Sequence, residues 1–217
     1  MKNIFLLLML VVSMPVFADF LPSTFSAQFE QRYISTLTGK ISKSKGTIDY
    51  KYPGHIKFDV VWPDPTLFVA NPEKSWQYTP PFIPGEKGQV AVRPSKNLML
   101  FKFFDVLKEG LKTNHLYEVV EEKDSYTVNF KGQTVDEIGL VKTKLFFSKK
   151  ENPTLLDLTE AVLSYKDKRE VTLKFIDMRT EVEFPENYFV FDEKANPVAA
   201  TTATATSQAV VAPSANK

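Results

Sequence analysis

The side chains that could support catalysis or metal binding are few and widely separated in this sequence. The two histidines, His55 and His115, lie far apart, and neither has a partner at the spacing of a metal-binding helix such as HExxH. The acidic residues Glu121, Glu122 and Asp124 fall at an expected hairpin turn, where solvated carboxylates are common. We therefore expect neither a metal site nor an acid–base pair.

The sequence also lacks the motifs of the common enzyme classes. It contains no GxSxG, GxxxxGK[ST] or GxGxxG stretch, and it has no cysteine for thiol catalysis, a disulfide or lipid attachment. The net charge of +1 provides no basic stripe of the kind that binds nucleic acid. These features predict a protein that is not an enzyme, needs no cofactor and binds no nucleic acid.

Large apolar side chains at alternate positions are the main feature of residues 46–80. Because successive residues of a strand point to opposite faces, this alternation predicts strands with one apolar face. Turns rich in Pro, Gly, Asn and Asp separate them. We expect Leu67 and Val69 to continue the apolar face, which consists of Ile48, Tyr50, Tyr52, Ile56, Phe58, Val60, Trp62, Trp76 and Tyr78.

A first strand is predicted over residues 24–33, where Phe25, Ala27 and Phe29 alternate with polar residues. A helix is the alternative, since Phe25 and Phe29 are four residues apart, but the polar residues alternate too regularly for it. The lysine-rich segment 37–45 reads as a hairpin loop, for which a solvated turn is favoured over an anion site.

The period changes to that of a helix over residues 97–111. Ser95 or Asn97 is a candidate N-cap. The apolar stripe of this helix consists of Leu100, Phe103, Phe104, Leu107 and Leu111.

Strand patterns resume beyond the helix and continue to a final short strand, YFVF, at residues 188–191, with a break near residues 135–139. About ten or eleven short strands with hairpin spacing, and one or two helices, predict an antiparallel barrel or strongly curved sheet with a helical cover. A barrel of this size can enclose an apolar ligand. From the pattern alone, a fully packed core is an equally good account.

The two ends differ in composition from the middle of the chain. Residues 1–18 have a basic start, a short apolar run and small residues at a cleavage site, which predicts a secretory signal peptide cut after Ala18. An uncleaved membrane anchor is the alternative, but the run is shorter than the ~20 residues of a membrane span. Residues 195–217 contain no aromatic residue, and we expect a disordered tail, dispensable or tethering. One domain is expected over residues 19–194.

Two stretches of the sequence resemble the LolA family of periplasmic lipoprotein carriers. The first is FSAQFEQ, at residues 25–31, and the second covers residues 51–80, where KYP, IKF, WPDP, LFVA and WQYTP follow the family pattern without an evident gap. The second half of the chain resembles the family more loosely.

The resemblance implies an unclosed antiparallel β-barrel with a helical lid. It further implies a periplasmic carrier, here expected to be a monomer, that takes acylated lipoproteins from an inner-membrane transporter to an outer-membrane receptor. The side chains expected to line the acyl-chain cavity are Phe25, Phe29, Ile56, Phe58, Val60, Leu67, Val69, Trp76, Tyr78, Leu100, Phe103, Phe104 and Leu107.

Two departures from the family pattern concern the lid. The family has an arginine before the proline of its first motif, whereas this chain has Tyr52, the candidate lid latch, with one hydrogen-bond donor in place of five. The family's N-terminal helix has little room between Asp19 and Thr24. A binding module for another lipid or glycolipid, and an envelope-stress sensor with a packed interior, are the alternative functions.

Overall fold

The computed structural model describes residues 20–35, 38–95, 99–149 and 151–196. The first half of the chain forms six strands: β1 (Thr24–Ile34), β2 (Ile41–Lys51), β3 (His55–Trp62), β4 (Thr66–Ala70), β5 (Lys74–Thr79) and β6 (Gln89–Pro94). The rest forms α1 (Met99–Leu107), β7 (Tyr117–Glu121), β8 (Ser125–Phe130), α2 (Gly132–Ile138), β9 (Leu140–Phe147), a 3-10 turn (Leu155–Asp157), β10 (Leu158–Tyr165) and β11 (Glu170–Thr180).

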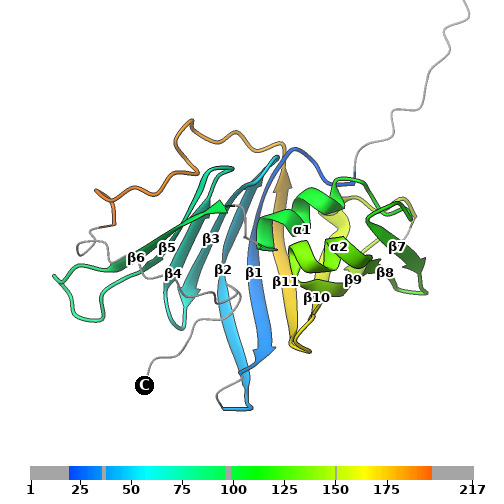
Figure 1. Cartoon of the computed structure of the whole chain (residues 1–217), viewed down its shortest axis with the longest axis horizontal. Helices are drawn as coiled ribbons and strands as arrows, with labels where there is room; N and C mark the ends of the chain where they lie inside the picture. Colours follow the sequence, from blue (N-terminus) through cyan, green and yellow to red (C-terminus); the bar gives the residue numbers. More distant parts are fainter. Residues whose placement is uncertain (1–19, 36–37, 96–98, 150, 197–217) are drawn as a thin grey trace, which may run out of the picture.

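All eleven strands belong to one antiparallel sheet (Figure 1). Its order is β6-β5-β4-β3-β2-β1-β11-β10-β9-β8-β7, so the first and last strands of the chain pair in the middle. The edge strands β6 and β7 do not pair with each other, and the sheet stays open. The predicted fold class, an unclosed antiparallel barrel with a helical lid, is confirmed.

The sheet has an inner face, which packs against α1 and α2, and an outer face (Figure 1). In β1 the residues Phe25, Ala27 and Phe29 are buried in the core of the inner face, while Gln28 between them is exposed. This alternation is that of a strand, so the helix alternative for this stretch is wrong. Within the described ranges, neither helix has the length and apolar content needed to cross a membrane.

Three local predictions are wrong. The polar segment 37–45 is mostly strand, because β2 begins at Ile41 and pairs with the whole of β1. The break near residues 135–139 belongs to α2, a short helix that ends at Gly139, whose left-handed backbone (φ 69°) suits glycine. Residues 188–191 form turns instead of a strand.

The expected signal peptide, its expected cleavage site after Ala18 and most of the expected tail lie outside the described residues. The candidate N-cap Asn97 also lies outside them. Ser95 does not serve as a cap, since its hydroxyl donates a hydrogen bond to the carbonyl oxygen of Asn71, 2.6 Å away.

Candidate functional site

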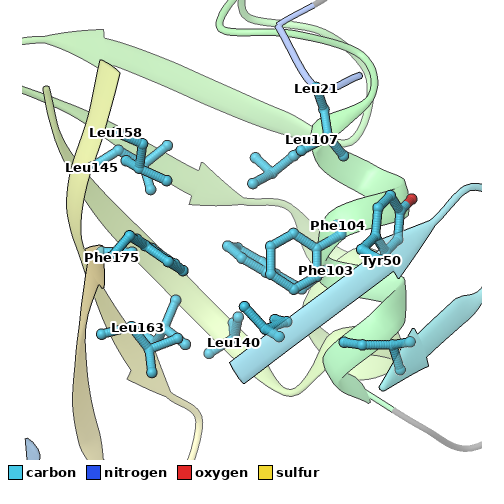
Figure 2. Packing of buried hydrophobic residues seen from close by; sticks show 14 of the residues in the cluster. Leu21, Tyr50, Phe103, Phe104, Leu107, Leu140, Leu145, Leu158, Leu163 and Phe175 are labelled. Atoms are coloured by element: carbon cyan, nitrogen blue, oxygen red, sulfur yellow. The ribbon is translucent and has the colours of Figure 1, made fainter. Parts of the chain in front are cut away.

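The apolar side of α1 lies on the inner face of the sheet, as the sequence predicts for a lid. Phe103, Phe104 and Leu107 are buried and point from the helix toward the strands (Figure 2). The ring of Phe104 packs edge-on against Phe25 at a centroid distance of 5.2 Å, and it lies 5.4 Å from the ring of Tyr50. Leu100 belongs to α1, but its side chain lies outside the described residues.

A second group of predicted site residues lines the inner face next to the helix. Ile56 and Val60 are buried in the same core, and Phe58 packs against it. Phe58 stacks on Phe29 of β1 with 4.3 Å between ring centroids. Gly46 of β2 lies between their strands, paired with Phe29 on one side and with Val60 on the other.

Four predicted site residues lie on the other side of the sheet. In β4, Leu67 pairs with the outer-face residue Asp59, and in β5 Trp76 and Tyr78 pair with Val69 and Leu67. Since directly paired residues share a face, the expectation that these four share a face with Phe58 and Val60 is wrong. The residues concerned are Leu67, Val69, Trp76 and Tyr78.

A C-terminal segment, residues 181–196, explains why aromatic residues are buried on the outer face. It follows β11 and runs back across the sheet toward β5 and β6 (Figure 1). Phe191 packs 5.3 Å from the ring of Tyr78, Phe189 packs 5.5 Å from His55, and the Tyr188 hydroxyl donates to Asp49 over 2.6 Å. The apolar outer-face positions of β4 and β5 therefore belong to a packed interface with this segment.

Sequence reasoning missed the half of the inner face that comes from β8 to β11. Phe103 lies 6.3 Å from Phe130 of β8, and Figure 2 shows the lid side chains facing those of the far strands. The alternation of Val171, Leu173 and Phe175 could have assigned β11 to this face. The buried residues that complete it are Val128, Phe130, Leu140, Leu145, Leu158, Ala161, Leu163, Val171, Leu173 and Phe175.

Asp105 of α1 holds the lid on the sheet. Its Oδ1 atom accepts a hydrogen bond from the Tyr50 hydroxyl over 2.5 Å and another from the backbone N–H of Gly54 over 3.2 Å. Burial, and then the hydrogen bond to Asp105, raise the pKa of Tyr50 well above its usual range, so the phenol remains a donor at neutral pH. We call this group, Tyr50, Gly54 and Asp105, the latch.

The predicted latch residue, Tyr52, lies beside this group. Its side chain is 44% exposed, and Lys108 Nζ lies 5.8 Å from its ring centroid. The same ammonium donates to the carbonyl oxygen of Leu21 over 2.7 Å, which ties the N-terminal segment to the end of the lid. An exposed cation–π contact is worth only about 0.5–1 kcal/mol, so the latch rests chiefly on Tyr50 and Asp105.

A second anchor fixes the chain after α1. The buried Tyr117 of β7 donates from its hydroxyl to the carbonyl oxygen of Gly110 over 2.5 Å. Burial raises the pKa of Tyr117 to about 12, and the negative charge of Glu109 adds a smaller increase. The hydroxyl therefore stays protonated throughout the neutral range.

Alkaline pH is expected to destabilise this anchor. The pKa of Tyr117 is higher in the folded state than the ordinary value of 10.0, so its contribution to stability is complete below pH 10 and is lost as the pH rises toward 12. Tyr117→Phe should cost about 1 kcal/mol at neutral pH and reduce the alkaline loss. Urea unfolding at a series of pH values measures both. Burial also raises the pKa values of Tyr50 and Tyr165, so the Tyr117→Phe variant should still lose some stability at alkaline pH. Equal alkaline slopes in the two proteins would contradict the prediction.

Two of the residues first considered as catalytic or metal-binding candidates, His55 and Glu122, form hydrogen bonds within the fold. His55 Nδ1 donates to the carbonyl oxygen of Pro53 over 2.7 Å, and Glu122 accepts from Lys144 Nζ over 2.6 Å and from Thr127 over 2.7 Å. In the part of the chain that the structure describes, no group of three or more His, Cys, Asp or Glu side chains could hold a metal ion.

The fold is an open antiparallel sheet whose apolar inner face is covered by α1 and α2. The family described as "Outer membrane lipoprotein carrier protein LolA" matches residues 22–192. The chain therefore belongs to the LolA family, whose members are carriers and not enzymes. Membership supports a lipoprotein-carrier or lipid-binding role and implies a periplasmic location.

Individual proteins match this chain either over a short stretch or at low sequence identity. An outer-membrane lipoprotein carrier protein from Dechloromonas aromatica is 39% identical over 77 residues, which span 35% of this chain and 35% of that protein. A LolA superfamily protein from Nitrosomonas europaea has a TM-score of 0.37 and 10% identity, covering 78% of this chain and 91% of its own. A DUF1329 family protein from Desulfovibrio piger has a TM-score of 0.34 and 11% identity, covering 80% and 91%. At these TM-scores the two structures say nothing about function.

Proposed function

We propose that this protein carries acylated lipoproteins through the periplasm from an inner-membrane transporter to an outer-membrane receptor. It acts by sequestration, with the acyl chains between the inner face of the sheet and α1. The observation that carries the proposal is the lid, which presents Phe103, Phe104 and Leu107 to an apolar sheet while few polar groups fasten it. Such a cover can lift without breaking a covalent bond.

The magnitudes favour displacement of the lid by an acyl chain. Moving three large apolar side chains into water costs about 1.5–3 kcal/mol each, or roughly 5–9 kcal/mol in all. A chain of about 15 methylenes contributes about 12 kcal/mol on burial, at about 0.8 kcal/mol per methylene. One acyl chain can therefore replace Phe103, Phe104 and Leu107 on the inner face.

Release depends on the same balance. A lid that returns to the sheet competes with the bound acyl chain, so the closed state lowers the affinity of the carrier. An outer-membrane receptor that binds the acyl chains more tightly then receives the cargo. We infer that Phe25, Phe29, Ile56, Phe58 and Val60 form the wall that the acyl chains contact.

A carrier in the periplasm must first be exported across the inner membrane, and the proposal includes this step. We propose that residues 1–18 direct export and are cleaved after Ala18. Mass spectrometry of the protein from the periplasmic fraction tests this directly, since the mature N-terminus should be Asp19.

The experiment for the carrier function uses the chain without its first 18 residues, incubated with a triacylated lipoprotein. We expect a soluble one-to-one complex on gel filtration, and none with the same cargo lacking its acyl groups. Phe58→Asp places a charge on the proposed wall, and the matched variant Val61→Asp places one at an exposed position of the same strand. The wall variant should lose the complex and the control should keep it. Absence of any complex with the unmodified chain would refute the carrier function.

A further inference from the structure

The hairpin formed by β1 and β2 extends beyond its neighbours in the sheet (Figure 1). The last residue of β3, Trp62, pairs with Lys45, so residues 41–44 of β2 lie beyond the end of β3. On the other side, β11 pairs with β1 as far as Tyr33. The hairpin therefore presents its end to solvent, away from the lid and the latch.

Two isoleucines lie opposite each other at this end. Ile34 of β1 pairs directly with Ile41 of β2, and their exposed fractions are 64% and 67%. Single exposed apolar residues are ordinary, but a directly paired set at a projecting end forms one contiguous apolar surface. Both side chains belong to the outer face, since Gln31 and Ser44 on the alternate positions are buried on the inner side.

Cations lie beside this apolar pair on the same face. Arg32 pairs directly with Lys43, and both are exposed, although like charges opposite each other on adjacent strands are destabilising. Residues 30–45 contain four cations, namely Arg32, Lys40, Lys43 and Lys45, and one carboxylate, Glu30. Glu30 forms an ion pair with Lys45 over 2.7 Å. The pKa of Glu30 is lowered chiefly by Lys45, with smaller effects from Lys174 and Lys43.

We propose that the outer face of the β1–β2 hairpin near its end docks on anionic phospholipid bilayers, with Arg32 and Lys43 at the phosphates and Ile34 and Ile41 at the edge of the acyl layer. A bilayer interface places anionic groups directly beside an apolar layer, which is the combination that this face offers. Nucleic acid has no comparable apolar layer beside its phosphates. The inference goes beyond the carrier function, because it requires no cargo and no movement of the lid.

The experiment is vesicle flotation with the protein recovered from the periplasmic fraction of cells that express the full chain. Vesicles of phosphatidylglycerol and phosphatidylcholine in about equal parts should carry the protein, and vesicles of phosphatidylcholine alone should not. Binding should weaken as salt rises, because the cations act through screened electrostatics. Arg32→Gln with Lys43→Gln should weaken binding by about tenfold or more, and Ile34→Ser with Ile41→Ser by about tenfold.

A matched control is the double variant Val141→Ser with Lys142→Gln. These residues are an exposed apolar side chain and an exposed cation on β9, away from the hairpin, and the change should leave vesicle binding intact. Circular dichroism and thermal unfolding confirm that each variant is folded. The proposal fails if the unmodified protein does not float with anionic vesicles, or if the hairpin variants bind as the control does. Binding to a polyglutamate peptide without binding to vesicles would overturn it in favour of an acidic protein partner.

Discussion

Gly46→Ala is expected to lower the free energy of unfolding by about 4 kcal/mol or more, enough to prevent folding of a marginally stable domain. A Cβ atom on Gly46 would lie 1.9 Å from the backbone oxygen of Asp59 and 2.9 Å from Cζ of Phe29. The first contact is with backbone, which cannot move aside without breaking the β2–β3 pairing. Urea unfolding monitored by circular dichroism measures the loss, and poor recovery of soluble protein would be its extreme form.

Gly85→Ala is the control for this result. Gly85 has a φ of 89°, and a Cβ atom added there would have no neighbour within 4 Å, so only backbone strain opposes the change. Its cost should be about 1–2 kcal/mol. If Gly46→Ala proved no more destabilising than Gly85→Ala, the close approach of β2 and β3 around Phe29 and Phe58 would be wrong, and with it the described shape of the inner face.

Alternation of apolar and polar residues predicted most of the strands, and the helical period predicted α1. Both succeed because they reflect local geometry, with a period of two residues in a strand and 3.6 in a helix. These periods place Phe25 and Phe29 on one face of a strand and Phe103 and Phe104 on one face of a helix, and the resemblance to the LolA family implied that the two faces meet, as they do in the core. The seven-residue helix α2 is too short to show a helical period, and it went unpredicted.

Alternation does not say which face of the sheet a strand presents after a turn. The register between neighbouring strands decides this, and a shift of one residue reverses every side chain. In β4 the register places Phe68 and Ala70 on the inner face and Leu67 and Val69 on the outer face. A segment more than one hundred positions further along the chain, around Phe189 and Phe191, then buries the outer face. The side-chain amide of Asn71, for example, donates a hydrogen bond to the carbonyl oxygen of Phe189.

The latch was beyond sequence reasoning for a similar reason. Tyr50 and Asp105 are 55 positions apart, and neither belongs to a motif that would pair them. The family comparison directed attention to Tyr52, two residues from the hydroxyl that bonds the lid. Tyr50 and Tyr52 both precede the turn at Pro53 and Gly54, and only the fold shows which phenol reaches the helix.

Removal of the Tyr50 hydroxyl is expected to open the lid. Tyr50→Phe keeps the ring against Phe25 and Phe104 but removes the hydroxyl that donates to Asp105. A hydrogen bond to a charged group contributes about 1.5–3 kcal/mol, so the closed lid should lose about that much stability. If lid opening limits the entry of ligand, uptake should become about tenfold faster for each 1.4 kcal/mol lost. Stopped-flow fluorescence of an apolar probe measures the uptake, and hydrogen exchange of the α1 amides measures the opening.

A double-mutant cycle separates the latch from a general loss of stability. Asp105→Ala also deprives the Gly54 amide of its partner, but that loss is common to the single and double variants and cancels in the coupling between Tyr50 and Asp105. Tyr52→Phe is the matched control, because it removes a phenol hydroxyl from the exposed neighbour and should change uptake by less than about twofold. A coupling near zero, or equal uptake by Tyr50→Phe and the unmodified protein, would show that the bond does not hold the lid. A coupling of about 1.5 kcal/mol or more, with faster uptake, makes the Tyr50 hydroxyl the element that sets how readily the inner face accepts a ligand.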